Sequence, residues 1–363
     1  MIWAVAIGLV LGTFGVSVCL TALVRKWSLR TGFVARPTAD RYHRTVVPLG
    51  GGIAIYATLM LFLAVAACGI QFVLVPGHFR SLTTAGGIDP VDFASKAGQL
   101  VIVMGVATVL FAVGLWDDKK KLGPFLKLVV QFLAATAAAW LADIRVELFI
   151  ESRTMTVLLS AVWMVLIMNA FNFLDNMDGA AAGMAVIVVA ILFAAAAGSG
   201  QVFVGGVALV FIGTLLGFLV FNFPPARIFM GDAGSLVMGF FLGLLSLRTT
   251  YYSQAGSGRG YAVLMPLVAM SVPLYDFASV TLLRIRQGKS PFVGDTQHFS
   301  HRLRRRGLTD RQTALTLYLA TLCTGIAAVF LNQVNMTGAV LIAVQTVLVL
   351  AMVAILEHTG GGQ

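Results

Sequence analysis

Charged residues are scarce in this sequence, and their scarcity excludes a water-soluble globular protein. Only 11% of the 363 residues are charged and 59% are hydrophobic, whereas soluble domains have about 25% charged and about 45–50% apolar residues. Such an apolar composition also excludes an intrinsically disordered chain. Cysteine is rare as well, with only Cys19, Cys68 and Cys323 present. Each lies alone in an apolar run, which excludes a disulfide scaffold and predicts small core residues.

Long apolar runs are abundant instead, and they predict an all-α, polytopic membrane protein. About 20 apolar residues suffice for one transmembrane helix, and charged residues, Gly, Pro or Asn separate eleven such runs. A cleaved signal peptide is not expected, because no Lys or Arg precedes the first run. We therefore treat residues 1–363 as a single integral-membrane domain. The predicted helices span residues 2–24, 51–72, 98–116, 124–142, 155–173, 181–198, 202–222, 235–250, 261–283, 313–332 and 337–356.

The positive charges predict how these helices are oriented. If the N-terminus lies outside, the inward connections hold 18 Lys and Arg residues and the outward connections hold six. Because cytoplasmic connections are the ones enriched in Lys and Arg, we expect the N-terminus outside and the C-terminus in the cytoplasm. The connections expected to form the active, cytoplasmic face are residues 25–50, 117–123, 174–180, 223–234 and 284–312.

Acidic residues gather on the same predicted face, although acids contribute little to topology. Asp117 and Asp118 end the third predicted helix, where the helix dipole disfavours a carboxylate by about 0.3–1 kcal/mol. This position indicates that a cation or a substrate supplies the missing positive charge. Neutralisation by the three lysines at 119–121 is the alternative.

A second acidic segment combines carboxylates with amides. Asn169, Asn172, Asp175 and Asp178 follow one another at three-residue steps, which predicts that they point from one helix face into one site. Their hard oxygen atoms suit Mg²⁺ or the hydroxyl groups of a sugar.

Residues 229–235 hold a third group of such side chains. The glycines of this segment permit close backbone approach, and Asp232 or Ser235 is expected to cap the helix that follows. The N-terminus of that helix is also suited to a phosphate group. Farther along, Asp276 lies within the ninth apolar run, where either a structural hydrogen bond or a catalytic role would retain a carboxylate.

Two basic segments complete the predicted face. In the 284–312 connection, Arg302 suits phosphate recognition, whereas solvation or contact with anionic lipid is favoured for residues 304–306. His298 and His301 have no third metal ligand beside them, so a zinc site is not expected. The other basic segment contains Arg41 and His43. Together these groups fit metal-assisted handling of a lipid phosphate ester.

At these residues the sequence resembles the polyprenyl-phosphate N-acetylhexosamine-1-phosphate transferases of glycosyltransferase family 4. The resemblance covers nearly the whole chain, with five motifs in the family's order. The motifs are Gly114-x-x-Asp117-Asp118-x-x-x-Leu122-x-x-x-x-Lys127-Leu128-x-x-Gln131, Asn169-x-x-Asn172-x-x-Asp175-x-x-Asp178-Gly179, Phe229-Met230-Gly231-Asp232-x-Gly234-Ser235, Pro273-x-x-Asp276, and Ser290-Pro291-Phe292-x-x-Asp295-x-x-His298-x-x-His301-Arg302-Leu303.

The resemblance implies transfer of a sugar 1-phosphate from a UDP-N-acetylhexosamine to undecaprenyl phosphate, with release of UMP and with Mg²⁺ (or Mn²⁺) as cofactor. It also implies the bacterial inner (cytoplasmic) membrane, a lipid bilayer around the chain, the EC 2.7.8 class and no nucleic-acid partner, and leaves homodimer formation open. The site residues carried over are the metal ligands Asp232 and Asn172; the catalytic residues Asp117, Asp118, Lys127, His298, His301 and Arg302; and the substrate-binding residues Asn169, Asp175, Asp178, Phe229, Arg41, His43, Asp276 and Asp295.

Three of these roles are specific in the family pattern. Asp117 resembles a base or phosphate-orienting acid, Lys127 resembles a contact for the lipid phosphate, and Phe229 resembles the residue that stacks on uracil. The Asp295-x-x-His298 form is similar to the N-acetylglucosamine-1-phosphate branch, although Ser300 stands where many members have a histidine.

Two other classes compete with this interpretation. A transporter or lipid flippase would also carry charges within the membrane, but it commonly shows internal repeats and a site near the midplane, and neither is visible in the sequence. An inactive or regulatory relative would also keep the fold, and the retained acids argue against it.

Overall fold

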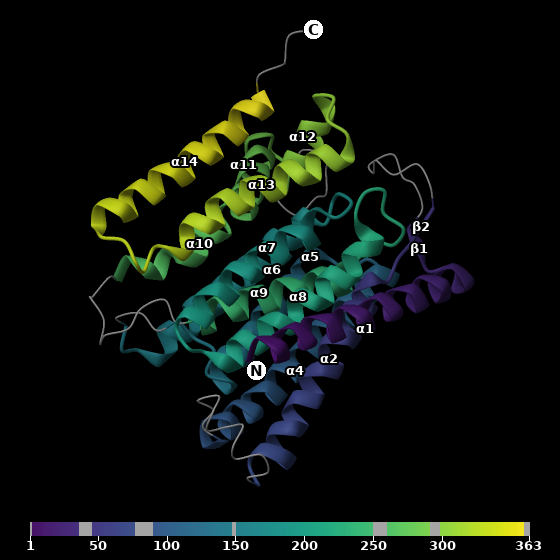
Figure 1. The fold of residues 1–363 in the computed structure, drawn as a ribbon. Coiled ribbons are helices and arrows are strands. Elements are labelled where there is room, and N and C mark those ends of the chain that lie inside the picture. The colour runs from purple at the N-terminus through teal and green to yellow at the C-terminus, as the bar shows by residue number, and fades with distance from the viewer. Residues whose placement is uncertain are drawn as a thin grey trace.

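A computed structural model describes residues 2–35, 46–76, 90–146, 150–249, 260–290 and 298–358. Helices dominate these segments, and one short antiparallel ribbon pairs Val34 with Pro48 (Figure 1). The elements are α1 (Ile2–Thr31), β1 (Val34–Ala35), β2 (Val47–Pro48), α2 (Gly51–Gly69), the π-helical η1 (Ile70–Leu74), α4 (Pro90–Lys119), α5 (Pro124–Leu141), α6 (Arg153–Leu174), α7 (Ala180–Gly198), α8 (Val202–Asn222), α9 (Asp232–Arg248), the 3-10 helix η2 (Gly260–Leu264), α10 (Met265–Ala269), α11 (Ser271–Arg286), α12 (Phe299–Arg305), α13 (Asp310–Val329) and α14 (Met336–His358).

The predicted all-α, polytopic class is confirmed. Within the described segments, nine helices are long and apolar enough to cross a membrane, or ten if a bent pair counts as one span. The eighth predicted run, residues 235–250, corresponds to α9, which has 17 residues, a length that can also cross a bilayer. This helix is buried inside the bundle.

The bent pair replaces the single helix predicted over residues 261–283. The η2–α10 segment and α11 meet at a 66° bend, which falls at Met270 between the two helices. Pro266 and Pro273 lie in the first turns of α10 and α11, where a helix tolerates proline because no backbone N–H is needed there. The two prolines therefore start two helices instead of interrupting one.

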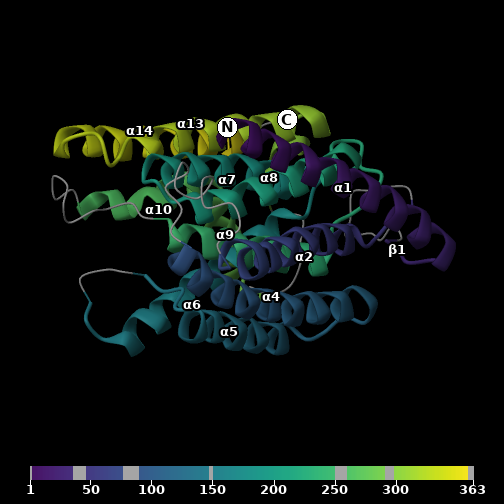
Figure 2. The same cartoon turned by 60° about the horizontal axis from the view of Figure 1, so that its bottom comes forward.

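Helix α9 is the centre of the bundle. Its residues from Ala233 to Ser246 are buried, and it packs against α2, α4, α6, α7 and α8. Figure 2 shows α13 and α14 on one side of the molecule and α4, α5 and α6 on the other. This central position gives α9 contacts with helices that are far apart in the sequence.

Glycines let α2 and α4 approach the start of α9 at backbone distance. A Cβ atom added to Gly52 would lie 2.2 Å from the backbone nitrogen of Gly234, and one added to Gly114 would lie 2.6 Å from the Cα of Ala233. These contacts confirm the predicted close backbone approach near Gly234, and they bring the C-terminal end of α4 beside the N-terminal end of α9.

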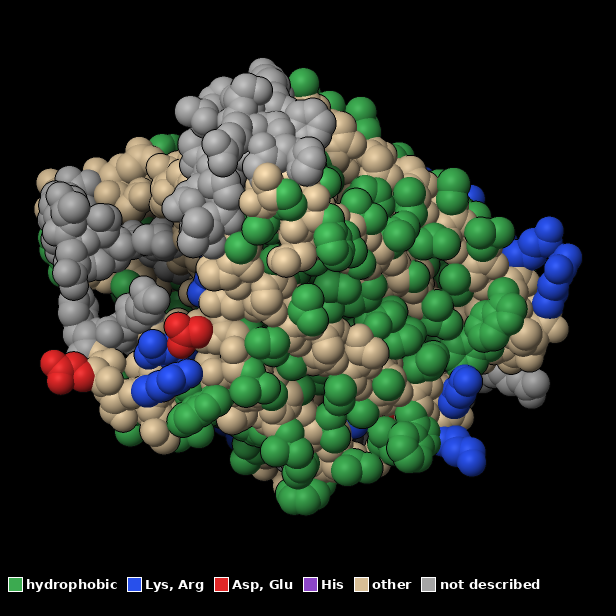
Figure 3. All heavy atoms as spheres, turned by 90° about the horizontal axis from the view of Figure 1, so that it is seen from below, with side chains coloured by type: hydrophobic (Ala, Val, Ile, Leu, Met, Phe, Trp, Pro, Cys, Tyr) green, Lys and Arg blue, Asp and Glu red, His purple; other side chains and the backbone are tan. Residues whose placement is uncertain are grey.

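The outside of the bundle is apolar over a broad area. Large hydrophobic side chains such as Phe72, Phe125 and Leu348 are exposed, and Figure 3 shows hydrophobic side chains covering the middle of one face with charged side chains toward its ends. The three cysteines are free and exposed, so their prediction as core residues was wrong. A lipid-facing surface is as apolar as a core, so an apolar run cannot distinguish the two.

Candidate active site

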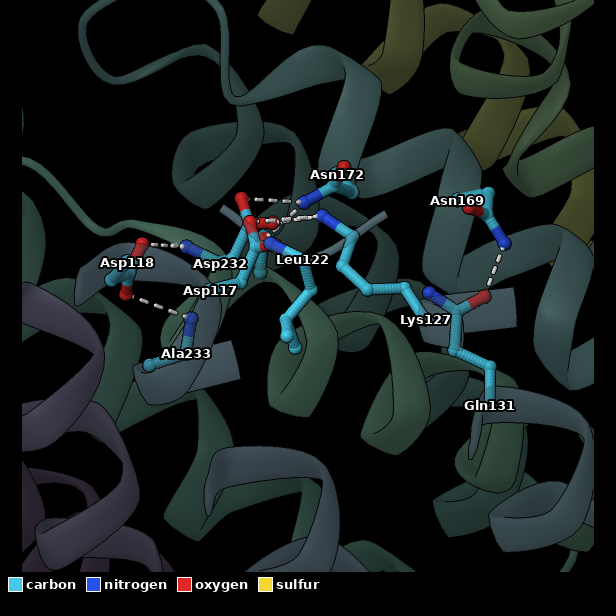
Figure 4. Close-up of polar contacts among 10 residues, drawn as sticks. Asp117, Asp118, Leu122, Lys127, Gln131, Asn169, Asn172, Asp232 and Ala233 are labelled. Atoms are coloured by element: carbon cyan, nitrogen blue, oxygen red, sulfur yellow. Dashed lines mark hydrogen bonds and ion pairs between the residues drawn. The ribbon is translucent and has the colours of Figure 1, made fainter. Parts of the chain in front are cut away.

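Three helix ends meet at one end of the bundle and bring oppositely charged side chains together. Asp117 ends α4, Lys127 begins α5 and Asp232 begins α9. The Lys127 ammonium lies 3.2 Å from Oδ2 of Asp117 and also donates to Oδ2 of Asp232 (Figure 4). The three side chains are 13–26% exposed. The site is thus an ionic cluster that solvent can reach.

Neutral groups hold the two carboxylates in place. The side-chain amide of Asn172, in the last turn of α6, donates to Oδ1 of Asp232 at 3.2 Å and to Oγ of Ser235 at 2.7 Å. The backbone N–H of Leu122 donates to Oδ1 of Asp117 at 2.6 Å. Each carboxylate therefore has one oxygen bound to the protein frame and one facing Lys127.

Charge and burial act in opposite directions on Asp232, which precedes the apolar part of α9. Burial by itself would raise the pKa of this carboxyl. The Lys127 ammonium and the hydrogen bonds from Lys127 and Asn172 outweigh burial and hold the pKa of Asp232 below its usual range. Asp232 is therefore an anion in the described arrangement.

Asp118 points away from this cluster and caps α9. Its Oδ1 accepts from the N–H of Asp232 at 2.8 Å and its Oδ2 from the N–H of Ala233 at 3.1 Å. The predicted capping by Asp232 or Ser235 is wrong, because Gly231 occupies the N-cap position with a φ of 75° and no side-chain cap bond. A carboxylate at a helix N-terminus complements the helix dipole.

The backbone around Phe229 is fixed by the start of α2. The N–H of Phe229 donates to the carbonyl of Pro48 at 2.9 Å, and the N–H of Gly51 donates back to the carbonyl of Phe229 at 2.8 Å. The Phe229 side chain is half-buried. It stands three residues before Asp232, at the same end of the bundle as the ionic cluster.

The acids and amides after Met168 have partners on several different elements. Asn169 donates to Gln131 at 2.6 Å, away from the carboxylates in Figure 4. Asp175 is the C-cap of α6, and Asp178 accepts from the N–H of Ala226 at 2.8 Å. Three residues advance about 300° around a helix, so each step turns the side chain by about 60°. Asn172 contacts Asp232.

A second, buried cluster contains Asp276 and His298. Oδ2 of Asp276 lies 3.0 Å from Nδ1 of His298, and Oδ1 accepts from the N–H of Phe299 at 2.7 Å. Nε2 of His298 lies 3.4 Å from a terminal nitrogen of Arg284. Arg284 was missing from the predicted site because its predicted helix ended at residue 283. The sequence feature that could have identified Arg284 is its spacing of about two helical turns from Asp276.

Helix α12 is attached to the end of α6 and to α11. Ser300, at the position where many members have a histidine, donates to the side-chain oxygen of Asn176 at 2.6 Å. Arg302 donates to Oγ of Ser279 at 3.0 Å. The predicted site residues Arg41, His43 and Asp295, together with the side chain of His301, lie outside the described part of the chain.

The ionic cluster fits a magnesium ion in the kind of atoms it offers. Asp117, Asp232 and Asn172 supply carboxylate and amide oxygens, and Mg²⁺ prefers one or two carboxylates together with substrate phosphates and water. Lys127 already bridges the two carboxylates, so the space between them accommodates a cation. No group of three or more His, Cys, Asp or Glu side chains suited to a metal occurs among the described residues.

The fold and this cluster define a class: polytopic membrane proteins with an ionic cluster of two carboxylates and an ammonium at one end of the bundle. Comparison with known proteins makes the class specific. The family described as glycosyl transferase family 4 matches residues 100–250, which contain the ionic cluster from Asp117 to Asp232.

Relatives match over most of the chain. A decaprenyl-phosphate N-acetylglucosaminephosphotransferase of Mycobacterium leprae is 30% identical over 89% of this chain and 83% of its own length. A probable undecaprenyl-phosphate N-acetylglucosaminyl 1-phosphate transferase of Bacillus subtilis is 28% identical over 94% of this chain and 88% of its own length. An undecaprenyl-phosphate alpha-N-acetylglucosaminyl 1-phosphate transferase of Yersinia pestis is 26% identical over 84% of this chain and 78% of its own length.

The chain therefore belongs to the polyprenyl-phosphate N-acetylhexosamine-1-phosphate transferases of glycosyl transferase family 4. It is a transferase of the EC 2.7.8 class, and a multi-pass membrane protein. The family expected from the five motifs is confirmed.

Proposed function

We propose that this enzyme transfers N-acetylglucosamine 1-phosphate from its UDP derivative to undecaprenyl phosphate in the presence of Mg²⁺, and releases UMP. The observation that carries the proposal is the Asp117–Lys127–Asp232 cluster, in which two carboxylates and an ammonium meet at the polar end of an apolar bundle. The names of the relatives, all of which act on N-acetylglucosamine phosphate and a polyprenyl phosphate, support the choice of sugar and acceptor.

The reaction joins two anions, so removing the repulsion between them is the main catalytic task. A phosphate oxygen of the lipid forms a bond to the phosphorus that carries the sugar, and the bond from that phosphorus to the UMP oxygen breaks. The acceptor phosphate is already an anion, and a general base is secondary. Lys127, at the first turn of α5, is the cationic group of the cluster that would neutralise the lipid phosphate.

Asp117, Asp232 and Asn172 would hold the metal ion, with Asp118 fixing the start of α9 beneath them. When bound, Mg²⁺ supplies charge neutralisation to the diphosphate of the donor. The backbone N–H of Leu122 holds the Asp117 carboxylate and the side-chain amide of Asn172 holds that of Asp232. Their separation is thus fixed before any ligand arrives, which is the preorganisation that electrostatic catalysis requires.

We also propose that the end of the bundle carrying this cluster faces the cytoplasm, with the N-terminus outside. The 18 basic residues on the predicted inward connections support this orientation. The exposed lysines 119–121 lie at that end, between α4 and α5. In a variant without the three native cysteines, Lys120→Cys should react with an impermeant maleimide only in inside-out vesicles. Reaction in right-side-out vesicles would reverse the orientation.

The decisive experiment measures UMP release by the purified protein with undecaprenyl phosphate, Mg²⁺ and a panel of UDP-sugars. UMP should appear with UDP-N-acetylglucosamine and depend on the lipid acceptor. The matched control for Asp232→Asn is Asp143→Asn at the other end of the bundle, where a φ of 52° suits asparagine. Absence of UMP with every sugar would refute the proposal, and release with another sugar alone would change the donor.

A further inference from the structure

Three ionisable side chains are buried together at the junction of α11 and α12. Arg284 is 1% exposed, Asp276 is 0% exposed and His298 is 5% exposed. Arginine is almost never fully buried without a partner, and removing its charge from water is unfavourable unless opposite charge and hydrogen bonds compensate. The nearest compensating carboxylate of the cluster belongs to Asp276, which lies eight residues earlier on the same helix.

His298 bridges these two charges. Eight residues rise about 12 Å along a helix, so Asp276 and Arg284 lie two turns apart, and the imidazole ring occupies the interval between them. Its Nδ1 lies 3.0 Å from Oδ2 of Asp276 and its Nε2 lies 3.4 Å from a terminal nitrogen of Arg284. Both ring nitrogens of His298 thus have protein partners.

The chemistry of those partners selects one tautomer. A guanidinium group can only donate hydrogen bonds, so the Nε2 atom that faces Arg284 must carry a lone pair. The ring proton then lies on Nδ1, where the carboxylate of Asp276 accepts it. The opposite tautomer would place an N–H against the guanidinium and a lone pair against the carboxylate.

Packing joins this cluster to the ionic cluster. The guanidinium carbon of Arg284 lies 5.0 Å from the centre of the Phe173 ring, and the His298 ring packs edge-on against the same ring at 5.7 Å. Phe173 follows Asn172, which contacts Asp232. His298 is also the N-cap residue of α12. Its position therefore sets where α12 begins and where Arg302 lies on that helix.

We propose that Arg284 is a positioning residue of the transfer reaction, which holds His298 in the Nδ1-protonated tautomer and thereby fixes α12 against the end of α6. The expected effect of Arg284 on turnover rests on the proposed function, whereas the tautomer of His298 does not. It assigns His298 to positioning, with both nitrogens engaged, and leaves contact with the donor to residues on the open side of α12.

The tautomer is tested in the wild-type enzyme by ¹⁵N NMR on protein labelled at its five histidines, in lipid nanodiscs. The His298 signals are identified by their loss in His298→Gln. We expect a protonated Nδ1 and an unprotonated Nε2. A protonated Nε2, in either the other tautomer or the imidazolium form, would overturn the inference without the need for any Arg284 variant.

Two substitutions test the part played by Arg284. Arg284→Met removes the donor, and we expect mixed His298 tautomers and turnover lower by about 10- to 100-fold, as for other residues that orient a functional ligand. Arg284→Lys keeps a charged donor and should retain the tautomer and recover turnover to within about tenfold of wild type. Arg286→Met, an exposed position one half-turn away, should change neither readout.

The outcomes separate this inference from the proposed function. Unchanged His298 signals in Arg284→Met would overturn it, and so would an equal loss of turnover in Arg286→Met. If Arg284→Met does not yield folded protein, the wild-type and Arg284→Lys spectra decide. Wild-type enzyme that releases no UMP but shows the expected tautomer would refute the proposed function and keep the assignment of His298.

Discussion

Lys127 should compete with the metal ion for the same two carboxylates. Removing its charge should therefore strengthen binding of a divalent cation and weaken catalysis. Its ammonium contacts Asp117 at 3.2 Å and also bonds to Asp232. At about 4 Å and an effective dielectric constant of about 20, one such attraction amounts to about 4 kcal/mol, and the partial exposure of these side chains lowers it. In Lys127→Met the two carboxylates face each other without a counter-charge, so a divalent cation should bind them more tightly.

We expect the dissociation constant for Mn²⁺, measured by electron paramagnetic resonance without substrates, to fall at least about tenfold in Lys127→Met, which corresponds to about 1.4 kcal/mol. UMP release should fall by about 10²–10³-fold, as when one preorganised electrostatic group is removed. Lys121→Met is the matched control, because this lysine is exposed in the connection between α4 and α5. Unchanged or weaker Mn²⁺ binding in Lys127→Met would refute the reasoning.

The remaining predictions concern the frame of the same site. Asp232→Asn should lower UMP release by at least about 10²-fold while the protein still inserts, because its oxygen would no longer attract a cation. Asp118→Ala should lower the free energy of unfolding by about 1 kcal/mol, because two N–H groups at the start of α9 lose their acceptor, and a thermal unfolding assay in detergent measures this. Gly114→Ala should destabilise by about 1–3 kcal/mol, since its Cβ would meet backbone atoms of α9 at 2.6 Å. Gly105→Ala, on the same helix with no atom within 4 Å, is its control.

Three results would contradict these expectations. Full UMP release by Asp232→Asn would remove that residue from the mechanism. Wild-type thermal stability in Asp118→Ala would show that water replaces the cap. Equal stability losses in Gly114→Ala and Gly105→Ala would mean that the close contact between α4 and α9 contributes nothing.

Much of this protein could be predicted from sequence patterns because those patterns are local. Long apolar runs indicated the helices, since a chain in lipid must satisfy its backbone hydrogen bonds within each segment. The motif around Asp117 and Lys127 and the one around Asp232 indicated the residues of the ionic cluster. Their spacing along the chain also indicated the family, which the relatives confirm.

The sequence was less informative where the outcome depends on how one helix packs against its neighbours. The run over 235–250 gave no sign that α9 lies in the interior of the bundle, because apolar residues suit lipid and a bundle interior equally well. Asn169 was expected beside Asn172, but the helix rotation turns it toward Gln131. Sequence spacing describes one helix, whereas a site is built between several.

The sequence by itself determined the membrane class, the helices and the identity of the charged residues, because hydropathy and motif spacing act within short segments of the chain. Only the tertiary structure decided their roles: Asp117 binds Lys127 while the adjacent Asp118 caps α9. Two neighbouring aspartates differ in this way because close glycine contacts set how α4 crosses α9, and a crossing between helices has no local signal in the sequence.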